Sequence, residues 1–371
     1  MQTQTGINSP QAVKRWAISL AADVAEQAYM ERFTGKGANN IIEVKSDLES
    51  DAGDEVRFDI NMRFRQKPTY GDARLDGNEE ALKFYQDVVR IDQVRKGGDV
   101  GGRMTRKRTL HNYRSQVRQN TGTYLAEWMD EIAFAYLSGT GPNEAINQDS
   151  LIMDDDELLQ GFAQNPFQAP DDDHILYGGS ATSKATLTAA DTMSVALIER
   201  TVTKAKMMNA LDRDNIMIRP VKVEGADHYV MAMSPFDSHN LRTGAGDREW
   251  NAIQRAAAGA EGRKNPIFKG GLGMINNVVL HDHSRVRRFD DYGVGANIDA
   301  SRSLFMGAQA GMKAHGETNT GRYTWVEEPK DYGNSVGIAA GTICGMKKTR
   351  FNNRDYGVIS VDCAAADPNA A

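Results

Sequence analysis

The sequence predicts a fold of the α+β class, in which helices and strands do not follow one another in regular alternation. Apolar and polar side chains alternate from Glu55 to Arg65, a period of two that is typical of a half-buried strand. From Leu110 to Ala135, apolar side chains instead recur about every 3.6 residues, which predicts one long helix. Strand-like runs lie on both sides of this helix without an orderly βαβ series, so we expect a mixed architecture.

The bulk composition fits a globular protein. The length of 371 residues allows two or three packed units, and 40% hydrophobic with 25% charged residues is an ordinary globular content. No stretch approaches the ~18 apolar residues of a membrane span, and Met1 to Gly6 lacks the pattern of a signal peptide. Cys344 and Cys363 are the only cysteines. We therefore expect a protein made in a reducing cytoplasm, with no membrane as a partner.

Residues 1 to about 45 predict an arm with one amphipathic helix. The helix is expected from Pro10 to Phe33, with Ser9 as its N-cap and proline at the first helical position. Gly35 to Gly37 should end the helical segment. The side chains that fall on roughly one face of the helix are Val13, Trp16, Leu20, Val24 and Gln27.

Two strand-like runs, 55–65 and 84–92, are joined by a connection rich in turn residues. Together they predict one long hairpin with an extended tip. A two-stranded ribbon is at best marginally stable alone in water, and this ribbon has one apolar face. The cover for that face must come from the rest of the chain or from another copy of it, and the pattern leaves both open.

Charge is distributed unevenly along the chain, whose net charge is −6. Residues 119–183 contain twelve acidic side chains and no Lys or Arg, whereas nine Lys and Arg lie between Arg90 and Arg118. Four of these basic residues fall on similar sides of the predicted helix: Arg103, Lys107, Arg114 and Arg118. This basic patch could face the phosphates of DNA, pair with acidic residues of a neighbouring subunit, or simply be solvated surface.

The second half of the chain predicts several short elements. Gly139 to Pro142 should end the long helix, and the acidic span after it resembles an insertion loop. Thr188 and Asp191 have the spacing of a capping box at the start of another helix. Short strands are expected at 216–218, 229–233 and 277–281, and the alternating run 356–362 predicts a closing strand.

Sequence motifs for catalysis are missing. Gly35-Lys36-Gly37 lacks the spacing of a P-loop, and no Gly-x-Ser-x-Gly elbow occurs. His281 and His283 alternate on a predicted strand, so both imidazoles could hold one metal ion, but no second motif supplies a third ligand. A polar strand end is the favoured interpretation. We expect no enzyme, no cofactor and no metal, and the alternative from another class is a metal-dependent enzyme that uses His281 and His283.

Several strings, taken in order, resemble the major capsid protein family of N4-like phages, which are HK97-fold capsid proteins of tailed bacteriophages. The strings are Phe33-Thr34-Gly35 with Asn40-Ile41-Ile42, Leu75-Asp76-Gly77-Asn78-Glu79-Glu80, Asn265-Pro266-Ile267-Phe268 with Gly271-Leu272-Gly273, and Asp331-Tyr332-Gly333-Asn334. The resemblance runs from about Trp16 to Asp362, and the acidic span 143–173 does not match the family.

The resemblance implies an HK97-like capsid fold in five parts. These are an N-terminal arm (1–48), an extended β-hairpin loop or E-loop (49–102), a peripheral domain with the long spine helix and the acidic insertion (103–183), an axial domain (184–320) and a return to the peripheral domain (321–371). It also implies that the hairpin lies over a neighbouring subunit, which would cover its apolar face. The side chains expected at that intersubunit contact are Val56, Phe58, Ile60, Met62, Phe64, Tyr70, Leu75 and Phe84.

The implied function is that of a major capsid protein, which self-assembles through hexamers and pentamers into an icosahedral head shell around double-stranded phage DNA. The implied partners are further copies of the chain, DNA held by weak non-specific contacts, and scaffolding, portal and decoration proteins. Such a protein is assembled in the cytoplasm of a host bacterium and resides in the virion. An encapsulin-like compartment shell, which encloses a protein cargo, is the alternative within the same fold.

Overall fold

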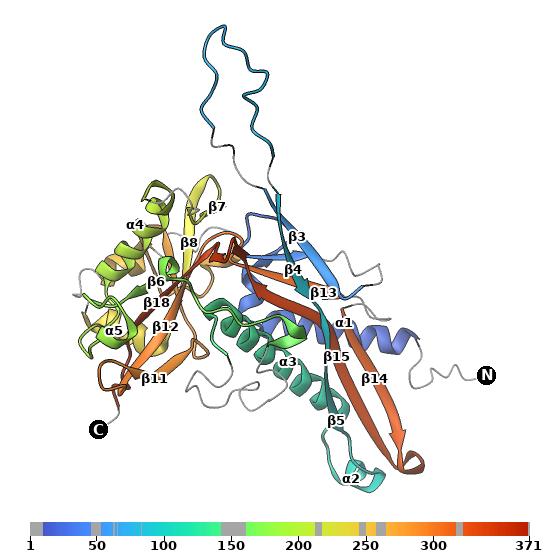
Figure 1. Ribbon diagram of the computed structural model, residues 1–371. Coiled ribbons are helices and arrows are strands. Elements are labelled where there is room, and N and C mark those ends of the chain that lie inside the picture. Colours follow the sequence, from blue (N-terminus) through green and yellow to red (C-terminus); the bar gives the residue numbers. More distant parts are fainter. Residues whose placement is uncertain are drawn as a thin grey trace.

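A computed structural model describes residues 10–45, 53–61, 64, 66–82, 84–141, 161–211, 217–244, 250–256, 265–316 and 322–369. These residues form two large β-sheets, and the helix α3 (Tyr113–Ser138) runs from one toward the other (Figure 1). A hairpin of β3 (Glu55–Asn61) and β4 (Phe84–Arg90) forms a separate two-stranded ribbon that pairs with neither of them. The predicted α+β class is confirmed.

The first sheet is built around the long strand β15 (Ser335–Lys348). β14 and β13 pair with successive parts of β15, β5 also pairs with β15, and β2 and β1 continue the sheet beyond β13. The bounds are β1 (Thr34–Gly35), β2 (Ile42–Lys45), β5 (Asp92–Asp99), β13 (Gly311–Gly316) and β14 (Tyr323–Lys330). Helices α1 (Pro10–Gln27) and α3 pack on this sheet.

The second sheet has the strand order β6-β18-β12-β8-β10-β9, with β11 beside β12 and β7 beside β8. Helices α4 (Val195–Leu211) and α5 (Pro235–Gly244) lie at this end of the molecule (Figure 1). The strand bounds are β6 (Ile175–Tyr177), β7 (Val221–Val223), β8 (Ala226–Met233), β9 (Gly273–Ile275), β10 (Val278–Asp282), β11 (Arg288–Tyr292), β12 (Ile298–Met306) and β18 (Val358–Ala364).

Short elements connect these parts. A two-stranded ribbon of β16 (Arg350–Phe351) and β17 (Arg354–Asp355) lies between β15 and β18, and α2 (Arg103–Arg108) follows β5. The 3-10 turns are η1 (Met30–Phe33), η5 (Phe162–Gln164), η6 (Asp172–His174), η7 (Lys184–Thr186), η8 (Pro266–Phe268) and η9 (Asp331–Gly333).

Two strands lie in a different sheet from the one that the predicted domain boundaries imply. β13 falls within the predicted axial segment 184–320, yet it pairs with β15 and β2 of the first sheet. β18 falls within the segment 321–371 that was expected to return to the peripheral sheet, yet it pairs with β12 and β6 of the second sheet. The predicted segments therefore do not coincide with the two sheets at these strands, because strand pairing depends on partners far away in the sequence and not on local pattern.

The long helix begins later than predicted. The 3.6-residue pattern placed Leu110 on it, but α3 starts at Tyr113 and Leu110 is fully exposed in the connection after α2. Asn112 caps α3, because its side chain accepts a hydrogen bond from the Ser115 N–H. The predicted end is confirmed, since Gly139 adopts the left-handed conformation with φ 65°.

The described part of the predicted arm is anchored to the body of the subunit. Leu20 and Val24 of α1 are buried against α3, and Trp16 stacks on Trp325 of β14 with ring centroids 5.5 Å apart. α3 continues through Gly122, where a Cβ atom would lie 3.2 Å from the Cβ of Asp23, so this glycine permits close approach of the two helices. Ser9 and the Val13 side chain lie outside the described residues.

Within the described part of the chain, no helix has the length and apolar character needed to cross a membrane.

Replacing Leu20 by Ala should lower the free energy of unfolding by about 2–5 kcal/mol, because the fully buried side chain leaves a cavity between α1 and α3. Ile18 on the same helix is 60% exposed and provides the control, since its change to Ala should cost less than about 0.5 kcal/mol. Chemical denaturation of both variants measures the difference. Equal stabilities would show that α1 does not depend on this packing.

Candidate functional site

The hairpin is the part of the molecule that extends furthest from the two sheets (Figure 1). β3 and β4 pair in antiparallel register from Glu55 opposite Arg90 to Asn61 opposite Phe84, so the predicted hairpin is confirmed. Beyond this stem the described connection, residues 66–82, projects away from the body. A hydrogen bond from the Gln66 N–H to the Glu80 carboxylate, at 2.8 Å, joins the two ends of this connection.

The apolar face of the hairpin stem is covered by the chain itself. Val56, Phe58 and Val89 are 4%, 2% and 0% exposed. They form a cluster with residues of β13, β16 and the segment before β18: Met312, Ala314, Phe351 and Tyr356. The prediction that Val56 and Phe58 contact a neighbouring subunit is therefore wrong for these two side chains. Period-two patterning reveals that a face is buried, but not which part of the chain covers it.

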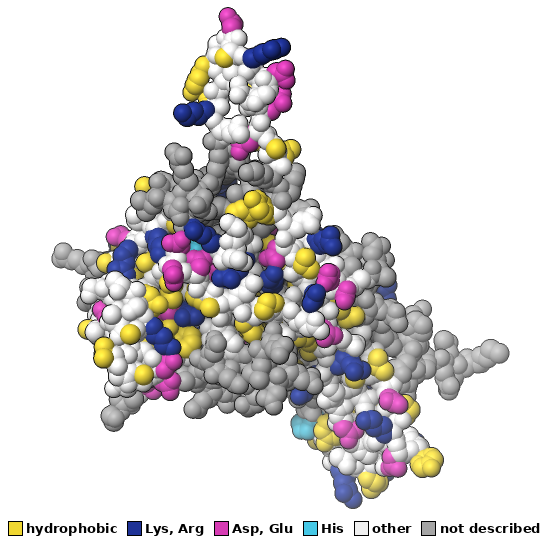
Figure 2. All heavy atoms as spheres, viewed as in Figure 1, with side chains coloured by type: hydrophobic (Ala, Val, Ile, Leu, Met, Phe, Trp, Pro, Cys, Tyr) yellow, Lys and Arg dark blue, Asp and Glu magenta, His cyan; other side chains and the backbone are white. Residues whose placement is uncertain are grey.

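The tip of the hairpin carries large apolar side chains in solvent. Phe64, Tyr70 and Leu75 are 64%, 78% and 61% exposed, so these three predicted contact residues are available to a partner. Figure 2 shows apolar, basic and acidic side chains together on this projecting tip. Leu82 is also exposed, although the sequence did not predict it as a contact residue, because it follows a turn-rich stretch that lacks the alternation of a strand. Met62 lies outside the described residues, as do the side chains of Ile60 and Phe84.

The four residues of the predicted basic patch lie on two different helices. Arg103 and Lys107 are exposed on α2, whereas Arg114 and Arg118 lie on α3. Arg114 pairs with Glu327 of β14 at 2.6 Å. Arg118 pairs with Asp23 of α1 at 2.9 Å. The common stripe is therefore wrong: Arg114 and Arg118 join α3 to its neighbours in the same chain, whereas Arg103 and Lys107 are in solvent.

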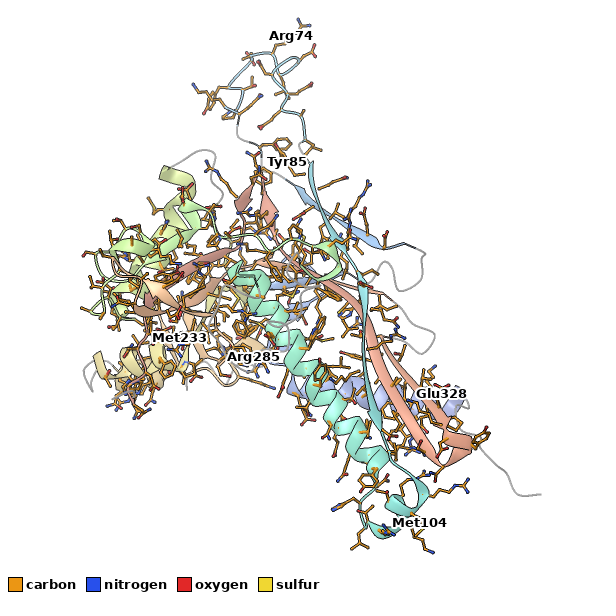
Figure 3. The ribbon with its side chains drawn as sticks, turned by 60° about the horizontal axis from the view of Figure 1, so that its bottom comes forward. Arg74, Tyr85, Met104, Met233, Arg285 and Glu328 are labelled. Carbon is orange, nitrogen blue, oxygen red and sulfur yellow. The ribbon has the colours of Figure 1, made fainter. Side chains whose placement is uncertain are left out.

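The exposed basic residues belong to a second projecting tip, made by α2 and the turn between β14 and β15. Arg103 donates its backbone N–H to the side chain of Asn334, and the Arg106 guanidinium donates to the Asn334 carbonyl at 2.9 Å. Large apolar side chains stand in solvent here too: Met104, Leu110 and Tyr332. Figure 3 shows Met104 and Arg74 at opposite ends of the molecule, so the chain carries one such tip at each end.

The two histidines of the alternative enzyme hypothesis are packed in an aromatic cluster. His281 is fully buried, and its Nε2 lies 2.9 Å from the carbonyl oxygen of Ile267. The ring of His283 stacks on Phe134 and lies 4.6 Å from Tyr29, centroid to centroid. Among the residues that the structure describes, no three His, Cys, Asp or Glu side chains are grouped so that they could hold a metal ion. This geometry does not favour the metal-dependent enzyme.

Burial keeps both imidazoles neutral. The loss of hydration lowers the pKa of His281 from 6.5 to about 4, with a smaller contribution from Arg32. Burial likewise lowers the pKa of His283 to about 4, and the neighbouring Arg285 and Arg32 add to the effect. A charged imidazole is therefore unfavourable at the place where η1, α3 and β10 meet.

Known proteins resemble this chain along nearly its whole length. The family described as phage capsid protein matches residues 4–367, nearly the whole chain. The chain belongs to this family. The major capsid protein of Pseudomonas phage KPP25 is 28% identical over 373 residues, which cover 94% of each protein. The capsid of Ralstonia phage GP4 is 49% identical and superposes with a TM-score of 0.88 over 100% of both chains.

More distant phage capsids share the fold of this family member. The capsid protein of cyanophage Pam1 is 20% identical, with a TM-score of 0.68 over 92% of this chain and 93% of its own. The HK97-like fold that the sequence resemblance implied is thus confirmed. Membership of the narrower N4-like group stays a prediction.

Lowering the pH from about 7 to about 4.5 should destabilise this capsid protein. Both histidine pKa values lie below the ordinary value in the folded chain, so the unfolded chain binds protons that the folded chain does not. Their contribution to stability is complete above about pH 6.5 and decreases by about 1.4 kcal/mol per pH unit per group as the pH falls toward 4.

Thermal unfolding at a series of pH values tests this dependence. The variant His283→Phe keeps an aromatic ring beside Phe134 and removes one titrating group, so its midpoint should fall less steeply with decreasing pH. The comparison concerns slopes, because loss of the hydrogen bond from the Arg285 N–H lowers the midpoint of the variant at every pH. Parallel curves for wild type and variant would contradict the assignment.

Proposed function

We propose that this chain is the major capsid protein of a tailed phage and that its copies assemble through hexamers and pentamers into an icosahedral head shell around double-stranded DNA. The observation that carries the proposal is the match of the capsid family to residues 4–367, together with a hairpin tip whose large apolar side chains are in solvent. The encapsulin-like alternative would use the same fold, but the match to phage capsids favours the head shell.

The hairpin tip is proposed as an intersubunit contact. Phe64, Tyr70 and Leu75 are each more than half exposed, and burying such side chains against a neighbour contributes roughly 25 cal/mol per Å² of apolar surface. One such contact is small on its own. Many copies in a closed shell act together, because each later contact forms between parts that are already held near each other.

Each of the two large sheets is proposed as the core of one domain. The first sheet with α1 and α3 corresponds to the peripheral domain, and the second sheet with α4 and α5 to the axial domain, after β13 and β18 are exchanged between the predicted segments. We further propose that Arg103 and Lys107 meet either packaged DNA or acidic residues of another subunit. Scaffolding, portal and decoration proteins are proposed as further partners, with assembly in the host cytoplasm.

Deletion of residues 66–80 should leave folded, soluble subunits that do not form closed shells. The stem keeps its buried cluster around Phe58, so the thermal midpoint should stay close to that of the wild type, while the contact with the neighbour is lost. Negative-stain electron microscopy with light scattering measures the outcome. The wild-type chain, which should give uniform closed particles, is the control, and particles of wild-type size from the deletion would contradict the proposed contact.

A further inference from the structure

The chain passes from the hairpin into the first sheet at a short junction, Arg90 to Asp92. Arg90 is the last residue of β4, which pairs with β3, and Asp92 is the first residue of β5, which pairs with β15. Figure 1 shows β4 leading almost directly into β5, so any rotation of the chain at this junction would redirect the whole hairpin.

Asn165 binds this junction through both polar atoms of its side chain. Its Oδ1 accepts a hydrogen bond from the Arg90 N–H at 2.9 Å, and its Nδ2 donates to the Arg90 carbonyl oxygen at 2.8 Å. The amide therefore satisfies both the N–H and the carbonyl group of Arg90, as a paired β-strand would. Asn165 is 2% exposed, so little water competes for these bonds.

The segment that presents Asn165 has a strained backbone. Ala163 and Gln164 both have positive φ, 56° and 58°, a conformation that residues with a Cβ rarely adopt in succession. Such strain persists only where surrounding contacts over-determine it, and it is concentrated at functional positions. Here the ring of Phe162 packs edge-on against Trp128 on one side of the strained pair. On the other side, the proline after Asn165 favours its extended backbone.

Two further contacts fix the position of this segment and of the junction. The Tyr136 hydroxyl of α3 lies 3.0 Å from the Phe162 carbonyl oxygen and 2.9 Å from that of Asn165. On the β15 side, a Cβ atom on Gly345 would lie 1.9 Å from the Arg90 carbonyl oxygen, so only glycine permits this approach. The junction is thus held between β15 and a segment anchored on α3.

We propose that Asn165 is a positioning residue that sets the direction in which the hairpin leaves the subunit, and thereby selects the contacts that its tip can reach on a neighbouring copy. This inference rests on the proposed shell function. The cluster around Phe58 holds the apolar face of the stem, whereas Asn165 acts on the backbone at its root. Loss of the amide should free the root without unfolding either sheet.

The test compares Asn165→Ala with a matched control. The control is Asn39→Ala. The Asn39 side chain likewise makes two hydrogen bonds to one backbone residue: it donates to the Lys222 carbonyl oxygen at 2.8 Å and accepts from the Lys222 N–H at 2.9 Å. Neither residue belongs to the hairpin. Spin labels on Arg57→Cys in the stem and Glu199→Cys on α4 report the distance from hairpin to body by electron paramagnetic resonance. Both native cysteines are buried and should stay unlabelled.

Asn165→Ala should broaden or shift the distance distribution, speed hydrogen exchange at the Arg90 amide and reduce the yield of closed shells several-fold. Asn39→Ala should leave all three unchanged. Asn165→Asp retains the acceptor for the Arg90 N–H and loses the donor, so it should give intermediate values, and it replaces Asn165→Ala if that variant fails to fold.

An unchanged distance distribution and shell yield in both Asn165 variants would overturn the positioning role. Failure of the wild type to form shells or rings, both alone and when made with the other head proteins of its phage, would contradict the proposed function instead. The distance and exchange measurements would still test the position of the hairpin.

Discussion

The C-terminal half of α3 is buried on all sides, and the relative placement of the two sheets depends on it. This helix carries two buried carboxylates into the interior. Asp130 accepts hydrogen bonds from the N–H groups of Tyr29 and Met30, both at 2.8 Å, and so fixes the segment that follows α1. Glu131 binds Arg285, which follows β10 of the second sheet, at 3.0 Å. A buried charge that loses its partner costs about 3–5 kcal/mol, so these bonds strongly favour one arrangement.

A third connection ties the end of α3 to the second sheet. Arg302 of β12 forms hydrogen bonds to both carboxylate oxygens of Asp362 on β18, at 2.8 Å each. The same guanidinium reaches the Ser138 carbonyl at the last turn of α3. One arginine therefore joins two strands and the helix end, and the Asp362 charge raises the Arg302 pKa despite burial. These bonds join the second sheet to the helix that packs on the first sheet.

The local sequence pattern predicts which segments form strands and helices, but it does not predict which other parts of the chain pack against them. The alternation from Glu55 onward identified the hairpin, because a half-buried strand must alternate. It could not show that Phe58 is covered by the same chain, since the covering residues lie about 250 or more positions away in β13 and β16. The start of α3 was missed because Leu110 fits the helical spacing although Asn112 caps the helix. Asn165 carried no signal, since an asparagine before a proline reads as an ordinary loop.

The position of β18 affects the order in which the chain can fold during synthesis. It lies between β6 and β12 in the second sheet, yet it follows β13, β14 and β15 of the first sheet along the chain. The ribosome therefore releases every described strand of the first sheet before the second can be completed. A nascent chain presents its hairpin early but cannot offer a finished second sheet to a neighbour until this late strand has emerged. The second sheet is thus completed by one of the last elements of the chain, whereas the hairpin is among the first.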